Sequence, residues 1–378
     1  MKFIHTSDTH IGCEIPIEYK EIRKKDFINA FKQVVDFAIR SKVDFILHSG
    51  DLFDSYFRIS SEILNEIVDL FMSLRDHDIK FIVIKGNHDT KGHRQKIFEL
   101  FKKLRLIEEP TLKNPIEISD CLIYGISEPV NIGGEDLTNA YKLLLKNINV
   151  KNSEYYKIFV FHGAPDIISK EFYDPRVVPT AYFPKNIDYY ALGHFHIKKL
   201  LEIENKIFAI PGSTERTEIS RKELNTTKVF YYICDKKLKE IPIKTRDIMV
   251  IEDILTSEEE IEKITHAIFS RSKETLFKTK LRVHQNIYNI VKNKIERLID
   301  SGYMIIEDIT LDSEEISLEM ETEKEALEEA FSKLLIDNKS EIFEIFNKIK
   351  EYLDDIFQGD SSDIDRLREV LRQEFIDV

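Results

Sequence analysis

The chain has 378 residues, of which 42% are hydrophobic and 33% are charged. This length predicts two or three domains with separate cores, and the composition excludes an intrinsically disordered protein. The formal net charge is −13, but residues 308–378 carry 22 acidic and 8 basic side chains, so the rest is nearly neutral and a nucleic-acid partner is not excluded.

Residues 1–239 alternate short apolar runs with amphipathic stretches. The runs that are typical of strands buried on both faces are 45–47, 81–84, 158–161 and 189–192. Apolar residues recur at helical spacing over 27–38 and 63–74. This alternation predicts an α/β sandwich, in which ligands gather at the carboxyl ends of the strands.

The pattern begins again at residue 240. We expect strands near 249–251, 280–283 and 304–306, and helices at 258–269 and 288–298, which together predict a small α+β domain over 240–310. An acidic linker follows at 311–322. Two amphipathic helical stretches fill 323–378 and bury too little to be stable alone, so they must pack on this chain or on a partner.

Cysteine usage and apolar runs indicate the compartment. Cys13, Cys121 and Cys234 are far apart and form no CxxC pair, which favours reduced thiols in the cytosol. The chain enters a strand-like run at once, so we expect no signal peptide. No run of about 20 apolar residues exists to span a membrane.

Five short motifs at the ends of apolar strands carry side chains that bind metals. They are Asp8-Thr9-His10, Gly50 to Asp54, Gly86-Asn87-His88-Asp89, Phe161-His162-Gly163 and Gly193-His194-Phe195-His196. In the first and last motifs, side chains two residues apart share a direction if the segment is extended. Carboxylate, amide and imidazole groups without thiolate suit manganese, iron or zinc.

The expected chemistry uses two ions. Asp51 is the natural bridge, because one carboxylate can offer an oxygen to each ion, and a pair about 3.5–4 Å apart can activate water and stabilise a leaving oxygen. His88 is expected to face the scissile phosphate as an acid or charge stabiliser, and Asp89 to fix its tautomer. Each motif alone could be a plain turn or strand end, and only their conjunction favours a site. His5 and His48, inside strands, are expected in the core.

These motifs, in this order, resemble the signature of the calcineurin-like metallophosphoesterase superfamily. The segment Pro211–Arg216 and the small second domain are most similar to the nuclease subunit of double-strand-break repair complexes, the SbcD-like and meiotic-recombination nucleases. The resemblance covers the chain in order and is strongest over residues 1–235. It implies two mixed sheets flanked by helices, a capping DNA-binding domain at 240–310, and a tail at 323–378 that docks on a coiled coil.

The resemblance also implies a ligand set and partners. One Mn²⁺ ion would be held by Asp8, His10, Asp51 and His196, and a second by Asp51, Asn87, His162 and His194. It implies 3′–5′ exonuclease activity on duplex ends and endonuclease activity on single strands or hairpins. The implied assembly is a homodimer with a coiled-coil SMC-like ATPase, at a cytoplasmic, nucleoid-associated location.

Alternatives stay open at this level. The same chemistry could act on nucleotides or phosphoproteins, or the chain could be a non-catalytic scaffold. Basic clusters at 20–25, 91–96 and 102–105 could hold DNA phosphates or be solvated helix faces. Residues 60–74 and 98–104 could form a dimer bundle or belong to the core.

Overall fold

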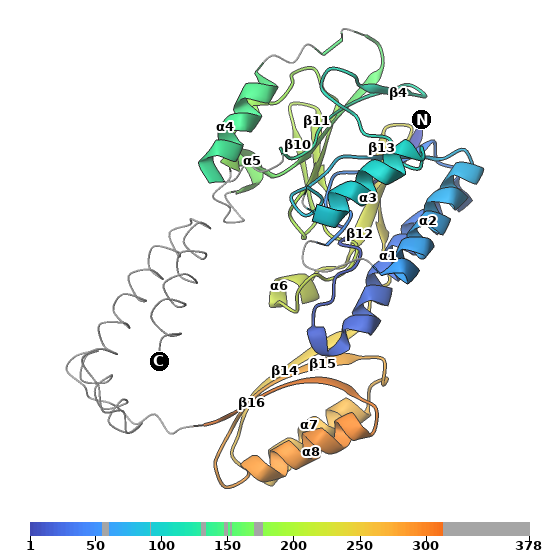
Figure 1. Cartoon of the computed structure of the whole chain (residues 1–378). Coiled ribbons are helices and arrows are strands. Elements are labelled where there is room, and N and C mark those ends of the chain that lie inside the picture. The colour runs from blue at the N-terminus through green and yellow to red at the C-terminus, as the bar shows by residue number, and fades with distance from the viewer. Residues whose placement is uncertain are drawn as a thin grey trace, which may run out of the picture.

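The computed structural model describes residues 1–54, 60–90, 92–129, 134–146, 150–151, 153–169 and 177–312 (Figure 1). The predicted tail at 323–378 and nearly all of the predicted linker lie outside the described residues. Within the described part, no helix is long and apolar enough to cross a membrane.

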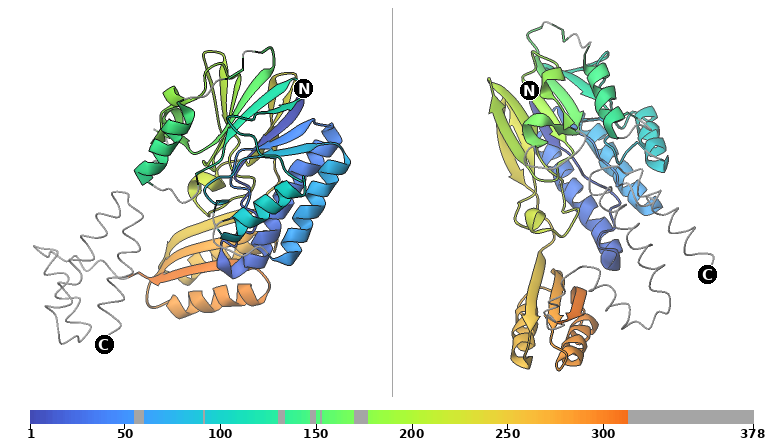
Figure 2. Two further views of the ribbon diagram at one scale, coloured as in Figure 1. Left: turned by 45° about the horizontal axis from the view of Figure 1, so that its top comes forward. Right: turned by 90° about the vertical axis from the view of Figure 1, so that its left-hand side faces the viewer.

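Two mixed sheets pack face to face in the first part of the chain (Figure 2). One sheet has the order β13 (Lys237–Pro242), β12 (Val229–Cys234), β1 (Lys2–Thr6), β2 (Phe45–His48), β3 (Lys80–Val83). The other has the order β10 (Lys199–Ile203), β11 (Lys206–Ile210), β9 (Tyr189–Gly193), β6 (Tyr156–His162), β5 (Cys121–Ile126), β4 (Ile116–Ile118). The Phe3 ring stacks on Phe45 and meets the Tyr189 ring from the opposite sheet edge-on. The predicted sandwich of two mixed sheets is therefore confirmed.

Helices cover the outer face of each sheet. The first sheet is covered by α1 (Lys20–Ser41), α2 (Ser61–Asp76) and α3 (Gly92–Lys103), and the second by α4 (Gly134–Leu145) and α5 (Asp166–Ser169) (Figure 2). The Phe31 ring on α1 meets the rings of Phe71 on α2 and Phe81 on β3, which joins helices and sheet in one apolar core. A short pair, β7 (Ala164–Pro165) and β8 (Val177–Val178), lies near α4 and α5.

The small second unit has a parallel sheet in the order β14 (Ile248–Leu255), β15 (Leu276–Val283), β16 (Met304–Leu311). The helices α7 (Glu258–Phe269) and α8 (Tyr288–Asp300) pack on one of its faces. Ser257 and Glu260 form a capping box that fixes the start of α7. The expected strands and helices are all present. Because β13 runs to Pro242, we propose that the domain boundary lies between β13 and β14 rather than at residue 239.

Specific polar contacts join the small unit to the sandwich of two mixed sheets. The Tyr19 hydroxyl donates to the carbonyl of Ile305 at 3.0 Å and accepts from its amide at 2.7 Å, so it satisfies the free edge of β16. Arg246, in the connection before β14, donates to both carboxylate oxygens of Asp26, each at 2.7 Å. Arg23 donates to the same carboxylate and is only 1% exposed. Its place in the basic cluster at 20–25 had allowed a contact with DNA phosphates. The burial and the ion pair of Arg23 instead make it a structural residue.

Candidate metal centre

The five motifs lie at the carboxyl ends of strands from both sheets. The loops after β1, β2 and β3 carry three of them, and the ends of β6 and β9 carry the other two. Glycine is required where these loops touch. A Cβ atom on Gly193 would lie 2.2 Å from the carbonyl oxygen of Ser49, and one on Gly86 would lie 2.3 Å from Oδ1 of Asp51. The glycines therefore allow loops from opposite sheets to converge.

Four of the expected ligands have a left-handed backbone. The φ angles are 49° at Asp8, 46° at His10, 55° at Asp51 and 88° at His194. The extended backbone under which Asp8 and His10 would share a direction is therefore absent at these two residues. Non-glycine residues in this region cost roughly 1–3 kcal/mol each, and such strain collects at functional sites. Here these conformations occur at residues whose side chains gather at the carboxyl ends of the strands.

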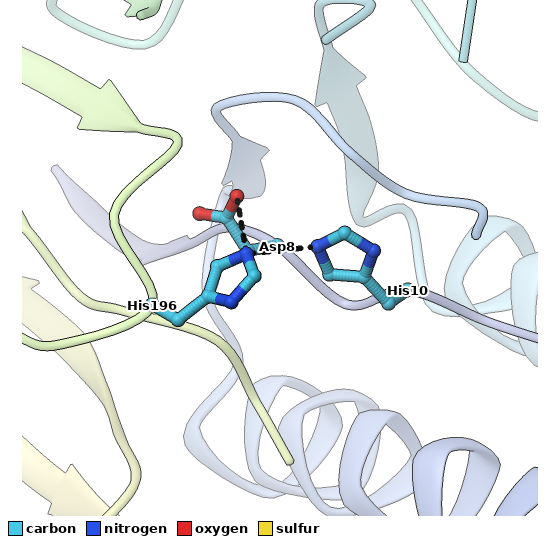
Figure 3. A group of neighbouring side chains, drawn as sticks. All are labelled: Asp8, His10 and His196. Carbon is cyan, nitrogen blue, oxygen red and sulfur yellow. Dashed lines mark hydrogen bonds and ion pairs between the residues drawn. The ribbon is translucent and has the colours of Figure 1, made fainter. Parts of the chain in front are cut away.

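Asp8, His10 and His196 form one half of the cluster (Figure 3). The Nε2 atoms of His10 and His196 are 3.2 Å apart, and Nε2 of His196 lies 3.9 Å from Oδ1 of Asp8. The Asp8 carboxylate also accepts hydrogen bonds of 3.1 Å from the amide of His194, which fixes its orientation. These atoms converge from the loop after β1 and the loop after β9.

Asp51, Asn87, His162 and His194 form the other half. Nε2 of His162 lies 3.2 Å from Oδ2 of Asp51 and 3.2 Å from Oδ1 of Asn87. The ring centroids of His162 and His194 are 5.4 Å apart. Asp51 Oδ2 is also 3.8 Å from Nε2 of His10, so this carboxylate lies between the two halves. The structure thus brings all seven expected ligands into one cluster.

His88 and Asp89 differ in their placement. The His88 ring lies edge-on to the His10 ring with centroids 4.7 Å apart, and its amide donates to Oδ1 of Asp51 at 2.8 Å. The Asp89 carboxylate is fully buried and accepts hydrogen bonds from the backbone amides of Gly86, Leu52 and Phe53. These contacts join the loops after β2 and β3, a role that the sequence did not indicate.

Several groups that orient the ligands were not assigned from the sequence. The Ser49 carbonyl accepts from Nδ1 of His162 at 2.8 Å, so Nε2 is the atom that can bind a metal once its own proton is lost. Oδ2 of Asp54 lies 3.4 Å from Nδ1 of His10. The position of Asp54 in the second motif was the signal that could have identified this residue. Ser49 acts through its backbone, which leaves no side-chain signal.

The donor set fits divalent metal ions. Carboxylate oxygens and imidazole nitrogens within each of the groups Asp8–His10–His196 and Asp8–Asp51–His162 lie within 4.8 Å of one another. Residues 1–198 match the family described as calcineurin-like phosphoesterase, which is more than half of the chain. The chain belongs to the calcineurin-like phosphoesterases. It is therefore a hydrolase, and divalent metal ions are its expected cofactors.

Curated relatives of this phosphoesterase carry the name DNA double-strand break repair protein Mre11. The protein from Sulfurisphaera tokodaii is 32% identical over 57% of this chain, although the match spans only 54% of that relative. The protein from Saccharolobus solfataricus is 29% identical over 93% of this chain and 98% of its own length. The protein from Methanococcus maripaludis is 24% identical over 95% of this chain and 100% of its own length.

Burial and neighbouring charges shift the pKa values of three groups in the phosphoesterase centre. Burial lowers the pKa of His162, but the Asp51 carboxylate outweighs burial and raises it to about 10. Burial also lowers the pKa of His10, and Asp54 and Asp51 again reverse the shift, so its pKa is raised. In return, burial raises the pKa of Asp51, but the His162 charge holds it well below its usual range. The metal-free centre therefore keeps His162 protonated on both ring nitrogens at neutral pH.

We expect metal affinity to increase with pH. Because the pKa of His162 is raised to about 10, the protonated form prevails below that pH, and a metal ion must displace the proton to bind. Titration calorimetry at pH 7 in two buffers with different ionisation enthalpies should report proton release on metal binding. Identical binding enthalpies in the two buffers, or an affinity independent of pH, would contradict this expectation.

His5 and His48 lie in the core, as the sequence predicted. Burial lowers the pKa of each to about 3, so both are neutral. His5 contacts the Tyr189 hydroxyl and the Ser49 hydroxyl, each at 2.9 Å. The three cysteines are free, and Cys13 and Cys121 are buried.

Proposed function

We propose that this phosphoesterase is a Mn²⁺-dependent DNA nuclease that acts in double-strand-break repair. One observation carries the proposal: seven carboxylate, amide and imidazole side chains from five loops meet around Asp51. The name of the relatives that span the whole chain supports DNA as the substrate. We propose 3′–5′ exonuclease activity on duplex ends and endonuclease activity on single strands.

We propose the ligand sets that the motifs suggested. Asp8, His10 and His196 would hold one ion, Asn87, His162 and His194 would hold the other, and Asp51 would bridge them. When bound, two ions supply hydroxide at neutral pH and stabilise the charge on the phosphate and on the leaving oxygen. The Ser49 carbonyl keeps the proton of His162 on Nδ1, so that Nε2 faces the ion.

His88 would serve the reaction without holding metal. Its side chain is half-buried beside His10, so one face is open to a substrate. Burial lowers the pKa of His88 to about 4, so its imidazole is neutral at pH 7. A neutral imidazole donates a hydrogen bond to a phosphate oxygen or to the leaving oxygen, and removal of one such donor costs roughly 10²–10³-fold. We propose this role for His88, with Asp89 holding the loop that carries it.

The small unit offers a surface for the DNA backbone. On the face of its sheet opposite α7 and α8, the central strand β15 presents Lys278, Lys280 and Arg282. This face adjoins the sandwich, because Arg221 on α6 (Arg221–Leu224) pairs with Glu252 on β14. We propose that it contacts phosphates, which gives affinity without reading the sequence.

The test of this proposal compares substrates. Purified protein with Mn²⁺ should degrade linear duplex DNA and leave cyclic nucleotides and phosphopeptides intact. Hydrolysis of the small substrates alone would favour the alternative phosphoesterase. If the chain binds less than one ion with manganese in excess and cleaves none of these substrates, the result would favour a non-catalytic scaffold.

We further propose a homodimer and an SMC-like ATPase partner, acting in the cytoplasm at the nucleoid. The helices α2 and α3 touch through the rings of Phe71 and Phe101. Met72 on α2 is 39% exposed, Leu100 on α3 is 46% exposed, and Leu104, just after α3, is 52% exposed. This apolar surface supports a dimer contact there, whereas Ile63, Ile67 and Phe98 are plain core.

We expect the tail to be needed for the ATPase and not for the chemistry. Deletion of residues 323–378 removes the amphipathic stretches, while the metal centre and both units lie within residues 1–312. Nuclease activity should be unchanged, and the truncated chain should fail to co-purify with the ATPase that the full chain binds. Retention of the ATPase by the truncated chain would refute the docking role.

A further inference from the structure

A buried polar cluster lies behind His196, on the side away from the expected metal. Nδ1 of His196 is 2.6 Å from the hydroxyl oxygen of Thr217 and 3.4 Å from Oε1 of Glu223. Thr217 is half-buried, and Glu223 is only 2% exposed. Glu223 lies on α6, where Ser220 caps the helix and accepts from the Glu223 amide.

The contacts of this cluster fix the direction of each hydrogen. The Thr217 hydroxyl donates to Oε1 of Glu223 at 2.9 Å, and the Thr217 amide donates to Oε2 at 3.0 Å. With its own hydrogen committed to Glu223, the hydroxyl oxygen accepts the hydrogen of His196 Nδ1. Nε2 of His196 then carries a lone pair, and Nε2 is the atom that faces His10 and Asp8. A second partner of this kind sets the tautomer and ring orientation of a metal-binding histidine.

Lys228 is the third member of the cluster and links Glu223 to the backbone of His196. Its Nζ pairs with Oε2 of Glu223 at 3.1 Å, and it donates to the carbonyl of His196 at 2.9 Å and to the Ser213 hydroxyl at 2.7 Å. Lys228 is 2% exposed, so its charge and that of Glu223 are both buried and must neutralise each other. The backbone and the ring of His196 are thus held by one connected group of side chains.

We propose that Thr217 and Glu223 are positioning residues for the ion that His196 holds. They keep the proton on Nδ1 and the ring in one orientation, so that Nε2 is ready for the ion without reorganisation. At His162, the Ser49 carbonyl is the group that keeps the proton on Nδ1. The histidine ligands of the two ions are therefore oriented by different groups. The inference rests on the proposed ligand role of His196, and it does not depend on DNA as the substrate.

The test uses Thr217→Val, which removes the hydroxyl, keeps the shape and leaves the pair of Glu223 and Lys228 intact. Equilibrium dialysis with Mn²⁺ should show one affinity reduced by about 10–100-fold, the range for outer partners of metal ligands, and the other unchanged. At a Mn²⁺ concentration that fills both sites of the wild type, electron paramagnetic resonance of the variant should show single ions in place of the coupled pair. Thr217→Ser, which keeps the hydroxyl, should restore both affinities.

Two reference variants separate the possible outcomes. His196→Ala should lose the same ion; if it keeps both, the ligand role itself is wrong. If His196→Ala loses the ion while folded Thr217→Val binds both ions as the wild type does, the positioning role is overturned. The melting temperature of the metal-free variants verifies folding. If Thr217→Val fails to fold, Thr217→Ala, which only removes atoms, takes its place with the same two outcomes.

Discussion

Asp51→Asn should abolish binding of both metal ions and all phosphodiester hydrolysis. Asp51 lies between His10 and His162, at 3.8 Å and 3.2 Å from their Nε2 atoms, so its carboxylate reaches both halves of the centre. Metal affinity should fall by more than about 10–100-fold, the cost of removing an outer partner of a metal ligand, because this substitution removes a bridging ligand from both ions. Asparagine keeps an oxygen that can accept the hydrogen bond from the His88 amide, so the loop should survive.

Bound manganese per chain and the rate of DNA degradation measure this effect. Asp69→Asn, on the exposed side of α2, makes the same chemical change away from the centre and should behave as the wild type. If Asp51→Asn still bound two ions, the bridging role would be wrong.

His88→Ser should keep both metal ions and reduce cleavage by roughly 10²–10³-fold, the usual cost of removing a hydrogen-bond donor that stabilises developing charge. The ring of His88 touches His10 but belongs to neither expected ligand set. Its amide, which holds Asp51, is unchanged by the substitution. The wild-type rate at saturating Mn²⁺ is the reference, and bound metal is counted in the same samples.

Exposed His77 on the far end of α2 provides a matched control, since His77→Ser removes an imidazole outside the centre. A His88→Ser protein with normal nuclease activity would remove His88 from the mechanism. Loss of metal in that variant would instead make it a ligand.

Much of the fold could be predicted because periodicity and composition report burial directly. The runs at 158–161 and 189–192 became β6 and β9, and the expected helix at 258–269 has those bounds in the structure. These segments are long, regular and bounded by turns, so local pattern and tertiary packing agree. The boundary after β13 was harder, because β13 pairs with β12 and its exposed residues carry no strong pattern.

The expected ligands were also visible, since five motifs with carboxylate, amide or imidazole groups follow apolar strands in one chain. Their backbone geometry was not visible. Left-handed φ angles at Asp8 and His10 arise from contacts between loops that only the folded chain brings together, such as the hydrogen bonds from Asp8 to Gly50 and from His10 to Asp51. The partners of the ligands were equally hidden. Thr217 and Glu223 lie on a loop and a short helix with no motif, and the Ser49 carbonyl has no residue signature.

The most direct test is a crystal soaked in Mn²⁺ and measured at a wavelength where manganese scatters anomalously. We expect two peaks about 3.5–4 Å apart, with Asp51 between them and the other six ligands divided three to each side. A single peak, or peaks away from these seven side chains, would contradict this expectation.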